Sequence, residues 1–208
     1  MSAASGPRRR AMTDRPASGC VLLCDRGTWP AWETSSHMGR LLIEGIPFHV
    51  DSMGGYVGKP IGESDWLSID QTRINLFSEA TEDRNPLHVD PAWAAANGPF
   101  GSTIAHGFLT LSLLSFLSRS GDLQPDGVDY GINLGFERIR FLAPVTVGDR
   151  IKLRLTLMEI KPRGEGKWQY KLRCSIVTEK TGKTALSAVW LVLFVSAARA
   201  GEDGRPFG

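Results

Sequence analysis

Residues Ile104–Leu117 read IAHGFLTLSLLSFL, and this stretch predicts the centre of the fold. A helix built from it carries apolar side chains almost all round, so we expect other parts of the chain to cover it. The apolar run covers about a dozen residues, well short of the ~20 that a membrane-spanning helix needs. A buried helix of a globular protein is therefore expected. Its apolar positions are Phe108, Leu109, Leu111, Leu113, Leu114, Phe116 and Leu117.

The chain after this helix has the pattern of β-strands, from Tyr130 to Val195. In WQYKLRCSI, residues 168–176, apolar and polar side chains alternate, as they do in a strand with one covered face. Turn signals separate the strands: TVGDRI at 146–151, PRGEGK at 162–167 and EKTGKT at 179–184. The prediction is an α+β fold in which a curved antiparallel β-sheet wraps around a central apolar helix.

Two shorter helices are expected before the apolar segment. DWLSI, residues 65–69, predicts a short strand, and Asp70 is a suitable N-cap for a helix over 71–80. Asp90, followed by a proline, predicts a second helix that ends at Gly98. The residues between these two helices should then form a loop.

An acid and an imidazole lie in that loop, at Asp83 and His88. Pro86 fixes its own φ and pushes Asn85 toward the extended region, so the loop backbone has few conformations open to it. A carboxylate and an imidazole that reach the same water form an acid/base pair, which addition of water to a double bond needs. The residue types alone also allow a turn cap at Asp83 and a packed histidine at His88. A metal site at His88 and Asp90 would lack a third ligand at a recognisable spacing.

His106 and Gly107 stand at the start of the predicted apolar helix. Backbone N–H groups without intrahelical partners and the positive end of the helix dipole gather at such a start. A thioester oxygen that gains negative charge would be stabilised there, and Gly107 has no side chain to block its approach. A glycine needed only for close helix packing is an equal alternative.

Composition excludes several classes of protein. The chain has 208 residues, 42% of them hydrophobic, and a net charge of +2, too mild to indicate nucleic acid as the main partner. The three cysteines, Cys20, Cys24 and Cys174, show no disulfide or zinc-site spacing, so a reducing, cytoplasmic location is expected.

Three regions are expected along the chain. Residues 1–52 begin with a segment rich in Gly, Pro, Ser and Arg, so we expect disorder or an extension that precedes the true start of translation. Residues 53–196 should form the domain, and residues 197–208 a flexible tail. A protein that starts at Met53 is then expected to fold and keep its activity.

Three stretches of this chain resemble the MaoC-like dehydratases, which include the (R)-specific enoyl-CoA hydratases of the hot-dog fold. They are FSEATEDRNPLHVDPAWAA at 77–95, GSTIAHGFLTLSLL at 101–114 and FERIRFLAPVTVGDRI at 136–151, within a resemblance that runs from about Tyr56 to Val195.

The resemblance implies roles for single residues. Asp83 and His88 match the family's catalytic pair, the backbone N–H of Gly107 would contribute to an oxyanion hole, and Asn85 would orient the loop or the water. Pro86 and His106 would support this site. Glu82 stands where many members have glycine, which should alter the flexibility or charge of the loop while leaving the pair intact.

The implied reaction is addition of water to a trans-2-enoyl-CoA, giving an (R)-3-hydroxyacyl-CoA, without a metal or a redox cofactor. The implied partners are an acyl-CoA substrate and a second copy of the chain, with no nucleic acid and no membrane. An acyl-CoA thioesterase of the same fold and a non-catalytic acyl-CoA-binding protein are the alternatives. Cations on the predicted strands could meet the coenzyme A phosphates: Arg138, Arg140, Lys152, Arg154, Lys161, Arg163 and Lys167.

Overall fold

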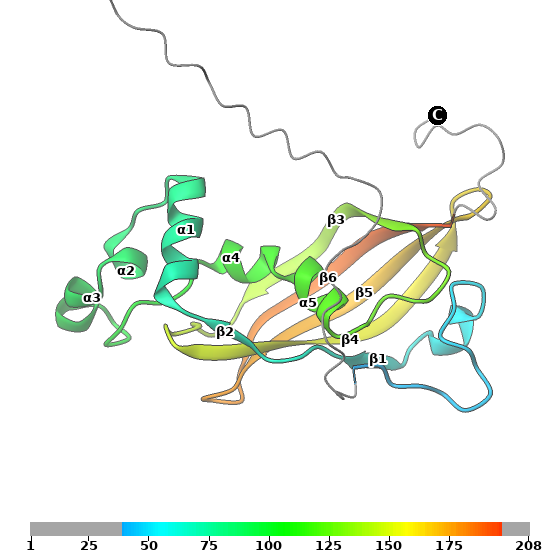
Figure 1. Ribbon diagram of the computed structural model, residues 1–208, viewed down its shortest axis with the longest axis horizontal. Helices are drawn as coiled ribbons and strands as arrows, with labels where there is room; N and C mark the ends of the chain where they lie inside the picture. The colour runs from blue at the N-terminus through cyan, green and yellow to red at the C-terminus, as the bar shows by residue number, and fades with distance from the viewer. Residues whose placement is uncertain (1–38, 197–208) are drawn as a thin grey trace, which may run out of the picture. The chain divides into compact units, whose positions relative to one another are not determined.

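The computed structural model describes residues 39–196, so the predictions for residues 1–38 and for the tail at 197–208 lie outside the described residues. The described chain combines one sheet with short helices (Figure 1). In chain order the elements are the 3-10 helix η1 (Met53–Tyr56), β1 (Pro60–Glu63), β2 (Leu67–Ile69), α1 (Gln71–Thr81), α2 (Pro86–Val89), α3 (Pro91–Asn97), α4 (Gly107–Ser112), α5 (Leu114–Ser120), β3 (Tyr130–Phe141), β4 (Asp149–Pro162), β5 (Lys167–Thr178) and β6 (Thr184–Val195).

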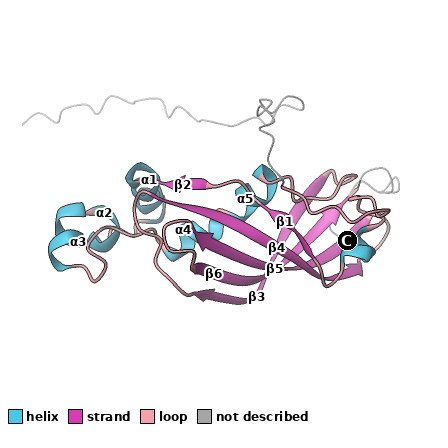
Figure 2. Ribbon diagram, turned by 90° about the horizontal axis from the view of Figure 1, so that it is seen from below, coloured by secondary structure: helices cyan, strands magenta, loops and turns pink. Residues whose placement is uncertain are grey.

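The predicted antiparallel sheet is confirmed, with strand order β1-β4-β5-β6-β3 and β2 also paired to β4. The three predicted turns fall where strands begin or end, at Gly148, Gly164 and Gly182, each with a positive φ. Helices α4 and α5 lie across one face of the sheet (Figures 1 and 2). This is the expected arrangement of a sheet around an apolar helical segment.

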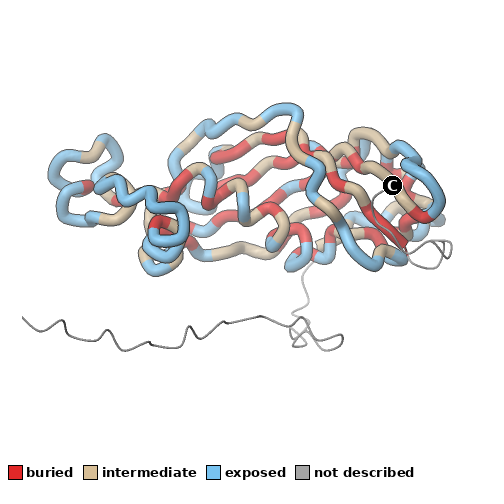
Figure 3. The backbone as a smooth tube through the Cα atoms, turned by 90° about the horizontal axis from the view of Figure 1, so that it is seen from above, coloured by how far each residue is buried: buried red, intermediate tan, exposed pale blue. Residues whose placement is uncertain are grey.

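The alternation in β5 decides which side of that strand faces the core. Tyr170, Leu172, Cys174 and Ile176 are at most 3% exposed, while Arg173 between them is exposed. Buried positions concentrate on the strands and on the segments that cross them (Figure 3). The strand pattern therefore predicted the covered face correctly.

The central apolar segment differs from the prediction, because it forms two short helices that meet at Leu113. The Ser112 hydroxyl donates to the carbonyls of Phe108 and Leu109, and such a bond competes with continuation of the helix. The segment is also not covered all round: Phe108 is 67% exposed and Phe116 is 42% exposed. The prediction of one fully buried helix is wrong for this single chain.

The packed structure begins before residue 53. Phe48 and Val50 are each 4% exposed, and Phe48 packs edge-on against Tyr56 with ring centroids 5.3 Å apart. The Tyr56 hydroxyl donates to the carbonyl of Ile46 at 2.9 Å. The prediction that the whole of residues 1–52 lies outside the domain is therefore wrong for residues 39–52. These residues were missed because their short apolar patches lack a regular period.

Candidate active site

The segment that carries the candidate acid and imidazole is a helix end followed by a short helix, rather than the single loop predicted. The Asp70 carboxylate caps α1 by accepting from the N–H of Arg73, and α1 ends at Glu82 in the left-handed region with φ 58°. Asn85 then caps α2 by accepting from the N–H of Leu87, with Pro86 as the first residue of α2. Asn85 and Pro86 thus shape the backbone between Asp83 and His88.

Hydrogen bonds fix the ring of His88. Its Nδ1 lies 2.8 Å from the carbonyl oxygen of Ile104, and since a carbonyl only accepts, Nδ1 must donate. The Nε2 of a neutral ring then carries the lone pair and can accept a proton. The backbone of His88 is held as well, because its carbonyl accepts from the Gln71 amide at 2.7 Å. Gln71 is in turn bonded to the hydroxyl of Thr103 at 2.5 Å.

No sequence pattern singled out Gln71 or Thr103. Gln71 lies in the first turn of α1, and Thr103 is fully buried just before the segment that leads into α4. The sequence shows only that both side chains are polar. The hydrogen bonds that link them to His88 become visible once the fold brings the three residues together.

His106 joins the two halves of the site. Its ring is stacked on that of His88, with centroids 3.8 Å apart and planes 29° apart, and it also contacts the ring of Phe77, with centroids 5.1 Å apart. Its Nε2 lies 3.0 Å from the carbonyl oxygen of Asp83 and 3.9 Å from the Asp83 carboxylate. The His106 side chain is 3% exposed and that of Asp83 is 56% exposed, so a buried ring positions an open carboxylate.

The three side chains Asp83, His88 and His106 therefore meet, each offering one ligand-type atom within 4.8 Å of the others. A metal ion binds an imidazole nitrogen in the plane of the ring. Two stacked rings have nearly parallel planes, so an ion in the plane of one ring lies outside the plane of the other. The cluster suits hydrogen bonding to a small polar molecule better than ligation of one ion by both rings.

Gly107 is the first residue of α4 and follows His106, so the fold brings it next to the cluster. A Cβ at this position would lie 3.0 Å from the ring of Phe141. The missing side chain thus admits the Phe141 ring, which favours a packing role. The N–H of Gly107 comes before the first backbone bond of this helix, which Thr110 donates to His106, so a ligand can still use it.

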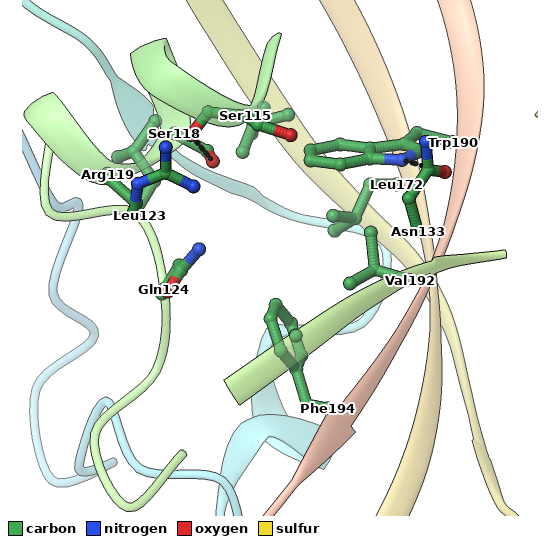
Figure 4. A pocket seen from close by; sticks show the side chains of 12 residues that line it. Ser115, Ser118, Arg119, Leu123, Gln124, Asn133, Leu172, Trp190, Val192 and Phe194 are labelled. Carbon is green, nitrogen blue, oxygen red and sulfur yellow. Dashed lines mark hydrogen bonds between the residues drawn. The ribbon is translucent and has the colours of Figure 1, made fainter. Parts of the chain in front are cut away.

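A cavity of about 120 Å³ lies between α5 and the inner face of the sheet (Figure 4). Leu155, Leu172, Val192 and Phe194 give it apolar walls, and Ser115, Ser118, Arg119, Gln124 and Asn133 give it polar edges. The indole N–H of Trp190 donates to the Asn133 Oδ1 at 2.9 Å, so these two polar atoms on the strand side are paired.

Most of the predicted cations already have partners within the described residues. Lys152 and Arg154 both bind Glu63, Lys161 binds Glu159, and Arg163 donates to Gln169. These four cations are thus bonded to side chains of β1, β4 and β5. The alternative of a solvated sheet face therefore describes them better than a phosphate site does.

The MaoC like domain matches residues 52–178. The chain belongs to the MaoC-like dehydratase family. Nodulation protein N of Rhizobium leguminosarum bv. viciae is 41% identical over 137 residues, 66% of this chain and 85% of that protein. The 3-hydroxyacyl-thioester dehydratase Z of Mycobacterium tuberculosis is 40% identical over 147 residues, 71% of this chain and 96% of that protein.

Solved structures agree with the MaoC-like assignment. The unliganded (R)-hydratase of Pseudomonas aeruginosa superposes with a TM-score of 0.56 at 29% identity, over 73% of this chain and 86% of that chain. The expected hot-dog fold is thereby confirmed. Within residues 39–196, no helix is both long and apolar enough to cross a membrane.

The structure explains how this MaoC-like chain accommodates Glu82 in place of the expected glycine. Glu82, at the position where the resemblance expects glycine, adopts the left-handed φ of 58° that glycine takes without strain. The side chain of Glu82 is exposed and pairs with Arg84 at 3.1 Å. The departure changes the charge in front of Asp83 and leaves the turn itself in place.

Proposed function

We propose that this MaoC-like protein is an (R)-specific hydro-lyase that adds water to a trans-2-enoyl thioester and removes it from the (R)-3-hydroxyacyl thioester. One observation carries the proposal: His88 donates through Nδ1 to Ile104, so its Nε2 lone pair remains for a water, and the His88 ring lies in the same cluster as the Asp83 carboxylate. The relatives named dehydratase and hydratase support the same class of reaction.

In the proposed reaction a water molecule donates hydrogen bonds to Asp83 and His88. As the water oxygen bonds to the β-carbon, the pair takes one of its protons, and a proton passes to the α-carbon on the same face of the alkene. The thioester oxygen gains enolate character during this step and would accept the N–H of Gly107. No metal or redox cofactor is needed, because the reaction moves only water and protons.

The acyl chain is proposed to occupy the cavity between α5 and the sheet. Apolar walls suit a hydrocarbon tail, and the cavity adjoins the helical segment that starts at Gly107. The carrier of the thioester is proposed to be coenzyme A. Replacing it by an acyl carrier protein in the same assay tests that choice.

Two substitutions test the acid/base pair. Asp83→Asn and His88→Ala should each lower turnover of crotonyl-CoA by ~10² to 10⁴-fold with little loss of thermal stability, since such groups contribute rates of that order. The losses should not add in the double variant, because both residues act on one water. His49→Ala is the matched control, since His49 has a 43% exposed side chain outside the cluster.

The same assay separates the alternatives. Loss of the enoyl absorbance without free thiol indicates hydration, whereas free thiol indicates a thioesterase. Binding of acyl-CoA with neither change would indicate a non-catalytic binding protein. Normal turnover in either single variant would contradict the roles of Asp83 and His88.

A further inference from the structure

The loop that follows α5 lines one part of the cavity. Along α5, Ser115 comes before Ser118, and the chain then turns into residues 121–126, which contribute Leu123 and Gln124 to the wall. On β6, the wall continues from Trp190 to Phe194 in the same direction (Figure 4). Gly107 begins α4, which lies between α1 and α5 in Figure 1, so the loop of residues 121–126, the closing loop, lines the cavity through Leu123 and Gln124 on the side away from the candidate active site.

Arg40 holds this closing loop by five hydrogen bonds. Its Nε donates to the carbonyl of Asp122 at 2.7 Å, and its terminal nitrogens reach the carboxylates of Asp122 and Asp126 at 2.8 to 3.1 Å and the carbonyl of Gln124 at 3.4 Å. A planar guanidinium can serve several acceptors at once, which a lysine cannot do. Its hydrogen bond also holds the pKa of Asp126 below the ordinary value.

Arg40 is itself held on the rest of the domain. The carbonyl of Gly39 accepts from Glu63 at 2.9 Å and the N–H of Leu41 donates to Ile61 at 3.0 Å, so the backbone around Arg40 is bonded to β1. The Arg40 guanidinium also lies over the ring of Phe48, 4.7 Å from its centroid. Arg40 therefore connects the closing loop to a part of the chain that is itself packed on the domain.

This contact lies outside the residues that the family model matches. The MaoC like domain match starts at residue 52, and Arg40 precedes it. The closing loop also keeps other anchors without Arg40, because Asp126 exchanges backbone bonds with Phe48 and Val50 and the N–H of Leu123 donates to the carbonyl of Ser118 at 2.9 Å. Removing the guanidinium should thus loosen Gln124, whose carbonyl Arg40 holds, and with it the Leu123 side chain, while the fold persists.

We propose that Arg40 is a specificity-determining positioning residue, which limits the length of the acyl chain by holding Leu123 and Gln124 across the end of the cavity. The inference rests on the proposed function for the identity of the ligand. The size of the cavity agrees with a short chain: an apolar cavity of about 150 Å³ holds one benzene, and this one measures about 120 Å³.

The test measures binding, so it does not depend on turnover. Saturated butanoyl-CoA and octanoyl-CoA are titrated calorimetrically into the full-length protein, Arg40→Ala, Arg40→Lys and Arg150→Ala. The wild type should prefer butanoyl-CoA. Arg40→Ala should shift the ratio of the two dissociation constants toward octanoyl-CoA by about tenfold or more, since one methylene in a pocket already changes discrimination by about that factor. Arg40→Lys should restore part of the preference, because one ammonium replaces only some of the bonds.

Arg150→Ala is the control, because Arg150 also pairs with a carboxylate, that of Glu179, and does not line the cavity. Its binding ratio should equal that of the wild type. Hydrogen exchange of residues 122–124 should rise most in Arg40→Ala, less in Arg40→Lys, and not at all in Arg150→Ala. An unchanged ratio in Arg40→Ala, a wild type without a preference, or a wild type that binds neither acyl-CoA would overturn the proposal. If the ratio shifts in a protein that shows no hydratase turnover, the role of Arg40 is supported and the proposed function is contradicted.

Discussion

His106 is the residue on which the geometry of the candidate site depends most. It touches Asp83 through Nε2 and His88 through its ring face, while its Nδ1 is buried without a hydrogen-bond partner among the described residues. A buried polar atom without a partner is unfavourable, so packing alone does not explain a histidine at this position. We interpret His106 as a positioning residue for the pair, because its own nitrogens are too buried to meet bulk solvent.

His106→Ala should lower turnover of crotonyl-CoA by about tenfold or more, because displacement of a reacting group by about 1 Å can reduce rates by ~10²-fold. It should also lower the free energy of unfolding by about 1–3 kcal/mol, since it empties a buried, hydrogen-bonded site. His88→Ala, at a partly exposed position, should lower turnover alone. Chemical unfolding and turnover measured on the same samples check this. Unchanged activity per folded His106→Ala molecule would contradict the role of His106.

The segment of residues 39–52 acts as one element of the domain even though it contains no helix and no strand. Phe48 fills the space beside Tyr56 and beneath Arg40, and Tyr56 is bonded to Ile43 and Ile46 of the same segment. Backbone bonds tie both ends of this segment, at Leu41 and at Val50, to other parts of the domain. A protein that starts at Met53 would lose these contacts, so we now expect it to be less stable than the full chain.

Phe48→Ala tests this at a single position. The substitution should lower the free energy of unfolding by about 3 kcal/mol, as truncation of a buried phenylalanine does. Leu42→Ala is the matched control in the same segment, because Leu42 is 70% exposed and its loss should change stability by less than about 0.5 kcal/mol. Urea unfolding followed by circular dichroism gives both values. Equal midpoints for the two variants would show that the segment adds nothing to the core.

At the scale of the whole molecule, the described chain has apolar surface that a single copy does not cover. Strand β3 forms one edge of the sheet and carries exposed Tyr130, Leu134 and Phe141, while Phe108 and Phe116 are exposed on the helices across the sheet. An unpaired edge with apolar side chains favours pairing with another chain. A second copy that covers both features fits a two-fold assembly.

We therefore expect a homodimer or an assembly of dimers. Leu134→Lys should shift the protein toward monomer at micromolar concentration, because a lysine on an edge strand opposes strand pairing. Leu42→Lys, on an exposed residue away from that edge, should leave the mass unchanged. Light scattering measures both. A wild-type monomer with full turnover would contradict the assembly.

Local rules account for what could be read from the sequence. Asp70 caps α1 and Asp90 caps α3 through side-chain oxygens three residues from their donors, so the helix starts were predictable. The alternation in β5 and the glycines at the turns likewise depend on neighbouring residues alone. Asp83 and His88 could be paired because only a few residues and one proline separate them. Their catalytic roles stay a prediction.

By itself, the sequence determined the antiparallel sheet, the helix caps and the segment that carries Asp83 and His88, because periodicity and capping act over a few residues. Only the tertiary structure decided that His106 bonds to Asp83, that Thr103 reaches Gln71 and that Arg40 reaches Asp122 and Asp126. It also decided that Phe108 is exposed although Leu109 beside it is buried. These contacts join residues that are 23 to 86 positions apart. Their partners depend on how whole elements pack, which no local pattern encodes.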